Sequence, residues 1–183
     1  MSHEQIAANL PENVLRAKGY SLWIVPEKKE LDELTILIQK LSERFKSPLF
    51  VPHMTLVGGI SQKEGEIEEK TKRLASNLKP FEVELEKIDY EEIWNRTLYI
   101  RGKDSSLLSY AFERSDYTFE TGNIPPFPHM SLAYGAFSNK SKEEAIREIG
   151  ENYPAKFRAS SLHLFYTQGH VDGWIKIEEF PLK

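Results

Sequence analysis

Apolar and polar positions along this chain follow two periods, one typical of strands and one typical of helices. Residues 20–26 are dense in β-branched and aromatic side chains and end at a proline, which predicts a strand. Residues 29–45 carry an apolar side chain every three or four positions, which predicts an amphipathic helix. Residues 50–60 then predict a second strand, and residues 63–78 predict a second amphipathic helix.

The central part of the chain predicts two paired strands followed by a helix. Residues 81–85 alternate strictly between apolar side chains and glutamates, which indicates a half-exposed antiparallel strand that continues irregularly to residue 93. A turn leads into a partner strand at residues 97–101. A helix follows at residues 104–116, where Asp104 is placed to cap its amino terminus.

The last third of the chain begins with a loop rich in glycine and proline, residues 120–128, which leads into a strand at residues 129–134. Ser141 and the glutamate three residues later have capping-box spacing and predict a helix that ends near residue 152. Strands at residues 157–167 and 174–180, joined by a turn, complete the chain. This mixture of antiparallel strands and helices predicts an α+β fold.

Two short phrases along the chain have almost the same sequence. Pro-His-Met-Thr-Leu occupies residues 52–56, and Pro-His-Met-Ser-Leu occupies residues 128–132. Each phrase belongs to a predicted strand with a helix after it, and no low-complexity linker separates the two. We therefore predict a single bilobal domain over residues 20–183, whose similar lobes face each other across a cleft. Residues 1–19 form an appended amino-terminal arm.

The two phrases carry the residues that we expect to be catalytic. On a strand, side chains two positions apart project from the same face, so each phrase places an imidazole and a hydroxyl together. Side by side, the strands would bring together His53, Thr55, His129 and Ser131. This set suits a phosphodiester, because one imidazole removes a proton from water, the other protonates the leaving oxygen, and the hydroxyls hold the phosphoryl oxygens.

A structural explanation of these residues has to be weighed against the catalytic one. A single histidine in a strand is more often a structural residue than a catalyst, and His-x-Thr alone is a weak motif. Repetition favours catalysis here, because both copies follow a proline, precede an apolar residue, and use two of only five histidines.

Composition narrows the class of protein. The 183 residues are enough to bury a core, and the absence of cysteine excludes disulfides, thiolate metal ligands and cysteine nucleophiles. A net charge of −4 and a pI near 5.8 argue against a surface dedicated to long nucleic acid and favour a small substrate. No run resembles a signal peptide or could span a bilayer, so we expect a cytoplasmic protein without membrane association.

Residues 53–56 and 129–132 resemble the paired motifs of the cyclic phosphodiesterases in the 2H phosphoesterase superfamily, which is named after two His-x-Thr/Ser motifs followed by a hydrophobic residue. The similarity extends over residues 20–182 and looks like the plant-type branch. It includes Tyr-Ser-Leu-Trp at residues 20–23, Phe-Val-Pro at residues 50–52, and a tyrosine five residues after the second histidine.

The resemblance implies a bilobal α+β fold in which two antiparallel sheets enclose a central cleft, with helices on the outside. It implies metal-independent opening of small cyclic phosphates without a cofactor, with substrates such as ADP-ribose 1″,2″-cyclic phosphate and nucleoside 2′,3′-cyclic phosphates. Carried onto this chain, it makes the two histidines the acid and the base, and Thr55 and Ser131 the phosphate ligands. We assign His129 as the base and His53 as the acid, although the motifs are nearly symmetric.

Tyr134 and Trp23 are further candidates for substrate binding. Strict alternation puts Tyr134 on the apolar face of its strand, away from His129, unless a bulge or Gly135 turns the strand end. A buried core tyrosine and a contact to phosphate or water are both open for this residue. Trp23 could stack on a nucleobase or line the cleft, whereas an aromatic residue in a central strand is more often part of the core.

The remaining histidines and two arginines have simpler explanations. We expect His163 to be structural, because it lacks a hydroxyl residue two positions later, and His170 to be exposed in a turn. Arg96 and Arg101 could bind a second phosphate, but arginines near strand ends are usually solvated.

Three other functions remain open. The first is an RNA-directed member of the superfamily that acts on 2′,3′-cyclic ends or 2′,5′ linkages, and the second is a module that binds cyclic phosphates without turnover. The third is a histidine-liganded metal hydrolase, although no ligand run such as His-Glu-x-x-His occurs. The partner that we expect is a small cyclic phosphate, and we expect the protein to be a monomer.

Overall fold

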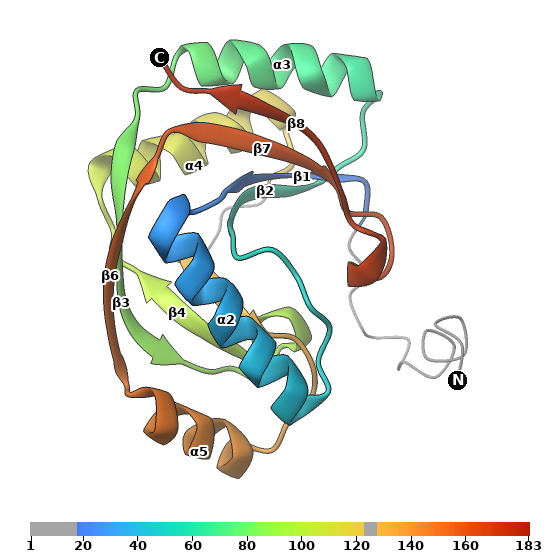
Figure 1. The fold of residues 1–183 in the computed structure, drawn as a ribbon. Coiled ribbons are helices and arrows are strands. Elements are labelled where there is room, and N and C mark those ends of the chain that lie inside the picture. The colour runs from blue at the N-terminus through green and yellow to red at the C-terminus, as the bar shows by residue number, and fades with distance from the viewer. Residues whose placement is uncertain (1–17, 123–127) are drawn as a thin grey trace.

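The computed structural model describes residues 18–122 and 128–183, which form eight strands, four α-helices and two short 3₁₀ helices (Figure 1). In chain order the elements are β1 (Tyr20–Ile24), α2 (Lys28–Phe45), β2 (Met54–Ile60), α3 (Glu64–Ser76), β3 (Phe81–Asp89), η1 (Trp94–Arg96), β4 (Leu98–Gly102), α4 (Ser106–Phe119), β5 (His129–Ala133), α5 (Asn139–Ile149), β6 (Asn152–Ala159), β7 (Ser161–Tyr166), η2 (Val171–Gly173) and β8 (Ile175–Pro181).

The strands form two four-stranded antiparallel sheets. The first sheet has the order β2-β1-β7-β8, and the second has the order β5-β4-β3-β6. The strands that carry the paired motifs, β2 and β5, are edge strands of their sheets and contact each other. The predicted α+β fold with two antiparallel sheets is confirmed, and the two motifs lie where the sheets meet.

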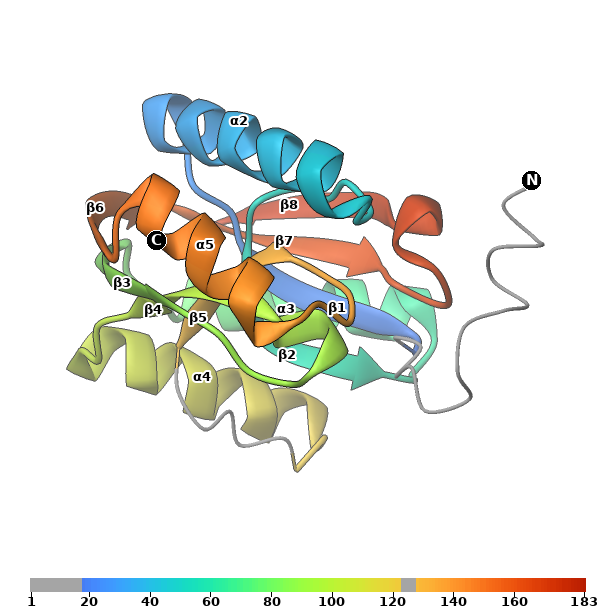
Figure 2. The same cartoon turned by 90° about the horizontal axis from the view of Figure 1, so that it is seen from below.

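Two helices cross between the sheets. Helix α2 follows β1 of the first sheet but packs against β5 and β6 of the second, whereas α4 follows β4 of the second sheet and packs against β2 of the first. In Figure 2, α2 and α4 lie on opposite sides of the strands. Helix α3 covers β7 and β8. Each sheet therefore packs against a helix that follows a strand of the other sheet.

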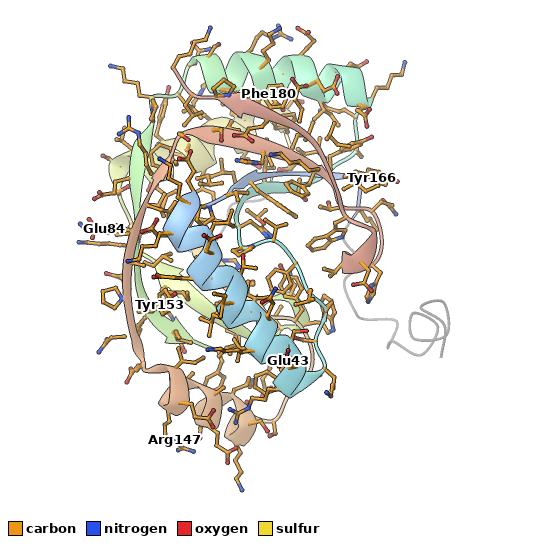
Figure 3. All side chains as sticks on the ribbon, in the orientation of Figure 1. Glu43, Glu84, Arg147, Tyr153, Tyr166 and Phe180 are labelled. Carbon is orange, nitrogen blue, oxygen red and sulfur yellow. The ribbon has the colours of Figure 1, made fainter. Side chains whose placement is uncertain are left out.

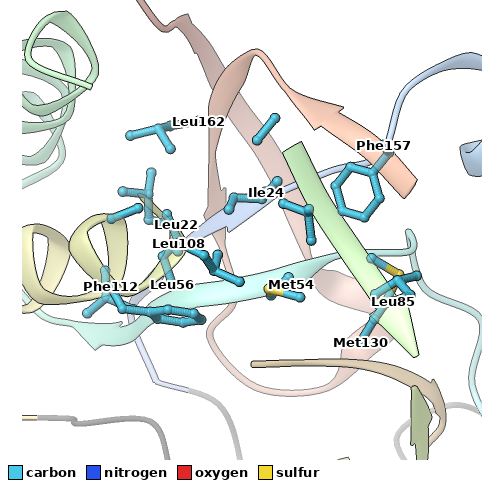
Figure 4. Close-up of a cluster of buried hydrophobic side chains, with 14 of the residues drawn as sticks. Leu22, Ile24, Met54, Leu56, Leu85, Leu108, Phe112, Met130, Phe157 and Leu162 are labelled. Carbon is cyan, nitrogen blue, oxygen red and sulfur yellow. The ribbon is translucent and has the colours of Figure 1, made fainter. Parts of the chain in front are cut away.

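The apolar positions of both motifs lie in one hydrophobic core. Met54, Leu56, Met130 and Leu132 are at most 2% exposed and belong to the same buried cluster. Figure 4 shows Met54, Leu56 and Met130 together with Leu22 and other apolar side chains. Burial of each such side chain contributes about 1.5–3 kcal/mol. This burial fixes which face of each motif strand points away from the core.

Charged side chains lie on the outer surfaces of α2 and α5, although Lys142 of α5 is only 1% exposed. Glu43 on α2 and Arg147 on α5 are exposed, whereas Phe180 on β8 is only 5% exposed and faces the core beneath α3 (Figure 3). Within the two described ranges, no helix is both long and apolar enough to cross a bilayer.

The predicted strand at residues 157–167 is two strands in different sheets. Strand β6 ends at Ala159 and belongs to the second sheet, and β7 begins at Ser161 and belongs to the first. Only Ser160 separates them, and its hydroxyl donates a hydrogen bond to the Glu27 carboxylate. Both stretches have a β pattern, so the pattern does not reveal that the chain changes sheets here.

The caps of two helices differ from the prediction. Ser105 caps α4, because its Oγ accepts a hydrogen bond from the Leu108 amide at 3.2 Å, and Asp104 lies outside the helix. Ser138 caps α5, so this helix starts before Ser141. Most of the predicted arm at residues 1–19 and the middle of the loop at residues 120–128 lie outside the described residues.

Candidate active site

The two motifs meet at the edges of the sheets. His53 immediately precedes β2, and His129 is the first residue of β5. Gly102, at the end of β4, shows how close the motifs are. A Cβ atom at this position would lie 2.9 Å from both Met54 Cε and Pro128 Cβ. Glycine thus permits the first motif and the second to approach the same point of the backbone.

Strand register places the polar motif residues on the faces turned away from the core. In the first sheet Thr55 lies opposite Trp23. In the second sheet His129 lies opposite Arg101, and Ser131 lies opposite Tyr99. Residues directly opposite each other in an antiparallel pair share a face. Each motif therefore presents its hydroxyl beside polar and aromatic neighbours, as the alternation of the motif predicts.

His53 is enclosed and held in a fixed orientation. His53 is only 5% exposed, and its Nδ1 lies 2.6 Å from the carbonyl oxygen of Val51. The indole of Trp23 stacks on the imidazole with centroids 3.6 Å apart and planes 12° from parallel. Trp174 meets the imidazole at a steep angle with a centroid distance of 6.3 Å. Among the described residues, Nδ1 of the ring has a backbone partner and Nε2 has none, so Nε2 is the nitrogen available for chemistry.

Burial makes His53 a neutral imidazole. Loss of hydration is the main cause that lowers the pKa of His53 to about 4, while the hydrogen bond to Val51 opposes this effect and His129 adds to it. The contribution of His129 also means that the two imidazoles are close enough to interact electrostatically. Because Nδ1 donates to a carbonyl, the neutral ring carries its proton there, and Nε2 is a proton acceptor.

His129 has an aromatic and a charged neighbour. Tyr99 meets its ring edge to face, with centroids 5.7 Å apart and an angle of 74°. Arg101, which faces it across the strand pair, donates through Nε and Nη2 to Asp89 Oδ2 at 3.0 and 2.8 Å. Burial raises the pKa of the Tyr99 phenol to about 12, and the carboxylates of Asp89 and Glu91 add to this effect. The phenol is therefore neutral at neutral pH.

The two hydroxyl residues of the motifs differ in their present partners. Ser131 is 6% exposed, and its Oγ donates to the carbonyl oxygen of Asn95 at 2.9 Å. Thr55 is half-buried. A phosphoryl oxygen could approach Thr55 directly, whereas Ser131 must turn its hydroxyl hydrogen away from Asn95 before it can donate to a phosphate.

A β-bulge turns Tyr134 towards Ser131. Leu98 pairs with Ala133 and Tyr99 pairs with Ser131, so the intervening Leu132 is an extra residue in β5. This insertion shifts the alternation by one position and places Tyr134 on the Ser131 side of the strand. Burial raises the pKa of Tyr134, and its contact with the Ser131 hydroxyl opposes that effect.

The first motif has a matching bulge in β2, but the residue that this bulge turns towards the motif hydroxyl has no side chain. Trp23 pairs with Thr55 and Leu22 pairs with Val57, which leaves Leu56 as the extra residue. The position equivalent to Tyr134 is then Gly58. A Cβ atom on Gly58 would lie 3.8 Å from Thr55 Cγ2, so this position shares the Thr55 face. The two halves of the site thus differ by a phenol on one side and a hydrogen atom on the other.

Trp23 supports His53 and does not offer a free aromatic face. It is 2% exposed, and Phe165 stacks on the side opposite to His53 with centroids 4.0 Å apart. Both faces of the indole are therefore covered. In this structure Trp23 holds the histidine ring in place, and a nucleobase could not stack on it without displacing a neighbour.

The structure adds aromatic residues that the motif analysis did not select for the site. Phe50 stacks on Tyr134 at 4.0 Å, and Trp174 lies beside both Trp23 and His53. The indole Nε1 of Trp174 is buried without a hydrogen-bond partner among the described residues. Phe50 stands three residues before His53, which is a signal in the sequence, but nothing in the sequence connects Trp174 with the motifs.

His163, His170 and the two arginines lie in local networks, whereas His3 lies outside the described residues. His163 Nε2 is 2.9 Å from Ser161 Oγ, and His170 Nδ1 accepts from the Asp172 amide at 3.4 Å. Arg96 donates to Glu91 through Nε and Nη2 at 2.9 and 2.6 Å. Among residues 18–122 and 128–183, no three His, Cys, Asp or Glu side chains are grouped as metal ligands would be.

Several solved proteins share this fold. TT0787 of Thermus thermophilus superposes with a TM-score of 0.66 at 15% identity, covering 90% of this chain and 97% of that protein. LigT of E. coli, solved in complex with NADP+, gives a TM-score of 0.59 at 12% identity and covers 92% of this chain and 99% of its own. Usb1 of Kluyveromyces marxianus gives a TM-score of 0.53 at 13% identity, covering 92% of this chain and 100% of that protein.

The two antiparallel sheets meet at edges that each carry one His-x-Thr/Ser motif, the pair of motifs after which the 2H phosphoesterases are named. The sequence pattern of the 2′-5′ RNA ligase superfamily, which is this class, matches residues 25–171, and the chain belongs to that superfamily. A cyclic phosphodiesterase from Arabidopsis thaliana is 21% identical over 127 residues, covering 69% of this chain and 70% of that protein. The expected resemblance to this superfamily is confirmed.

Proposed function

We propose that the protein is a metal-independent cyclic phosphodiesterase that hydrolyses small cyclic phosphates by acid and base catalysis with two histidines. The substrates are ADP-ribose 1″,2″-cyclic phosphate and nucleoside 2′,3′-cyclic phosphates. The observation that carries this proposal is the meeting of the matched motifs at the contacting edges of β2 and β5, where the imidazoles of His53 and His129 interact.

The reaction needs one proton removed and one supplied. Water attacks the phosphorus atom, and the base takes its proton as the new P–O bond forms. The ring bond to the ribose oxygen breaks, and the acid protonates that oxygen. A strained cyclic phosphate requires mainly positioning, these two proton transfers and donors to the phosphoryl oxygens. Both imidazoles return to their initial protonation states by exchange with solvent.

The environment of His53 favours it as the base. Its Nδ1 hydrogen is donated to the Val51 carbonyl, and burial keeps the ring neutral, so Nε2 can accept the proton of water. His129 then supplies the proton to the leaving oxygen. This assignment reverses the one that the nearly symmetric motifs suggested, because sequence alone does not reveal how deeply each ring is buried.

The hydroxyl groups hold the phosphate in this proposal. Thr55 and Ser131 each donate to a phosphoryl oxygen from opposite sheets. Tyr134 adds a third donor, because the bulge in β5 turns it towards Ser131 and its phenol is neutral. Trp23 is a positioning residue that keeps the His53 ring in place.

Hydrolysis of the proposed substrates in excess EDTA tests this function. We expect His53→Ala and His129→Ala each to lower turnover by about 10²-fold or more, because each removes acid or base assistance. His170→Asn is the matched control, since an asparagine side chain can still accept the Asp172 amide, and it should retain activity. Activity that survives both alanine substitutions would refute the two-histidine mechanism, and inhibition by EDTA would refute metal independence.

The superfamily to which the chain belongs supports a second candidate function. The same site could act on RNA that ends in a 2′,3′-cyclic phosphate or contains a 2′,5′ linkage, because the reacting groups are the same. A short RNA with a cyclic end, assayed beside the cyclic mononucleotides, separates the two candidates. Preference for the RNA by about tenfold or more in kcat/KM would favour the second. Binding without turnover of any of these ligands would instead identify a non-catalytic module.

A further inference from the structure

A cavity of about 670 Å³ lies beside His53 on the polar side of the first sheet. The segment that joins β1 to α2 forms one wall, and side chains of β7 and β8 form another. Val51 and Trp174 also line it, and both contact His53, the first through its carbonyl oxygen and the second through its ring. We call this space the side cavity. It shares these two lining residues with the surroundings of His53.

Strand register connects the side cavity with the first motif. Thr55, Trp23, His163 and Glu179 lie opposite one another across β2, β1, β7 and β8. They form a transverse row that begins at the motif and ends in the cavity. Three strand spacings separate its ends, a distance of about 14 Å. A ligand that reacts at the motif and also reaches the far end of the cavity must extend across this row.

The floor of the side cavity is apolar and separate from the main core. Trp23, Val25 and Phe165 form a small buried cluster, against which Leu31 and Trp174 pack. All but Trp23 line the cavity. A cavity of this volume with an apolar floor and a few polar groups at its rim is typical of small-molecule sites. Flat aromatic side chains in the floor suit a planar base.

The rim of the side cavity has two lysines, two carboxylates and the amino terminus of a helix. Lys28 and Lys176 line it, together with the first turn of α2. This helix has no side-chain cap, because the carboxylate of its N-cap residue Glu27 accepts from Ser160 instead. The amides of the first turn and the positive end of the helix dipole favour negative charge.

The carboxylates at the rim already have partners. Glu27 accepts from the Ser160 hydroxyl, and Glu179 accepts from Ser161 Oγ at 2.9 Å and from Lys176 Nζ at 2.7 Å. Lys28 has a φ of 52°, a left-handed conformation that is uncommon for a residue other than glycine. Strained backbone of this kind is retained where the surrounding structure or a function requires it.

We propose that the side cavity binds the part of the substrate beyond the cyclic phosphate, namely a planar base joined through phosphate groups to the reacting sugar. This inference rests on the proposed cyclic phosphodiesterase function and adds the place where the ADP part of the larger substrate binds. The aromatic floor holds the base, and Lys28 with the start of α2 holds the bridging phosphates. A cyclic mononucleotide uses only the motif site, whereas a dinucleotide-like cyclic phosphate uses both sites.

Two substrates of different length test the side cavity. With Lys28→Glu we expect the KM for ADP-ribose 1″,2″-cyclic phosphate to rise about tenfold at nearly constant kcat, because a bound negative charge loses its partner. The KM for adenosine 2′,3′-cyclic phosphate should stay within about twofold. Lys40→Glu, an exposed change of equal charge about 18 Å further along α2, should leave both substrates unaffected.

ADP provides a test that does not depend on turnover. We expect it to bind the wild-type protein with a change in tryptophan fluorescence, and Lys28→Glu should weaken this binding about tenfold while Lys40→Glu does not. Equal effects of Lys28→Glu on both substrates, or unchanged binding of ADP, would overturn the side-cavity proposal. Absence of turnover for both substrates in the wild type, with ADP binding intact, would instead overturn the proposed function and leave the cavity assignment standing.

Discussion

The imidazole of His53 is the clearest example of how a single residue is tuned by its surroundings. Burial lowers its pKa in the folded protein to about 4, whereas an unfolded chain titrates near ~6.5. Between these two values the unfolded state binds more protons than the folded state. The stability linked to His53 is therefore complete above pH ~6.5 and is lost as the pH falls towards 4.

This linkage gives a prediction about stability. Between pH 7 and pH 5, the free energy of unfolding of the wild type should fall by about 2 kcal/mol more than that of His53→Asn, because asparagine does not titrate. Urea denaturation at the two pH values measures both losses. Burial also lowers the pKa of His163, but both proteins contain this residue. Its contribution to the pH dependence of the unfolding free energy therefore cancels in the comparison. Equal losses would show that His53 is not held neutral.

Individual residues of the site were predictable only where the chain repeats itself. His53, Thr55, His129 and Ser131 stand out because the same phrase occurs twice. Tyr134 was ambiguous, since the bulge that redirects it has no signature in the sequence. Other aromatic residues of the site, such as Phe165 on β7 and Trp174 between η2 and β8, are distant from the motifs in the sequence, where nothing connects them with the site.

Among the secondary-structure elements, α5 shows how local chemistry sets a boundary. Two serines near its start, Ser138 and Ser141, could each cap the helix. The sequence pattern favoured Ser141 as the cap, because a glutamate follows it at capping-box spacing. In the structure the Oγ of Ser138 accepts from the Ser141 amide at 3.2 Å, so the helix begins at Asn139. Two equivalent caps three residues apart are not distinguishable by pattern alone.

The position of this cap can be tested by stability measurements. Ser138→Ala should lower the free energy of unfolding by about 1 kcal/mol, because a first-turn amide loses its acceptor. Ser141→Ala is the matched control and should cost less than about 0.5 kcal/mol. Urea denaturation of both variants compares them directly. A larger loss for Ser141→Ala would mean that the capping box predicted from the sequence is the true cap.

The connection between β6 and β7 was the largest error at the level of elements. A continuous β pattern over residues 157–167 gave no reason to divide the strand, although its two parts lie in different sheets. Sheet membership depends on which strands are available for pairing, and those strands are distant in the sequence. Residue patterns contain the strand signal but not the identity of the partner.

At the scale of the molecule, α2 and α4 each pack against the sheet that does not contain the preceding strand, and we expect this crossing to make the two sheets unfold as one cooperative unit. Ile38 on α2 is 1% exposed and lies in the shared core, although its helix follows a strand of the first sheet and packs against the second. Loss of its packing should therefore weaken both halves at once. The internal repetition predicts two lobes, but it does not predict that they exchange helices.

This cooperativity can be measured. Ile38→Ala should lower the free energy of unfolding by about 2–5 kcal/mol and keep a single transition with coincident fluorescence and far-UV circular dichroism curves. Ile36→Ala is the control on the same helix, because Ile36 is 51% exposed, and it should change the free energy by less than about 0.5 kcal/mol. Two separated transitions would show that the halves unfold independently.

The contrast between Gly58 and Tyr134 makes the two sides of the candidate site unequal, and in the proposed function we expect it to orient the substrate. A cyclic phosphate has two unlike ring oxygens, and a site with full twofold symmetry would accept the ring in either orientation. The phenol on one side and the hydrogen atom on the other remove this equivalence. In the proposed reaction the duplicated motif supplies the acid and the base, and we expect the unmatched pair to favour opening of one ester bond, so that one phosphate regioisomer predominates among the products.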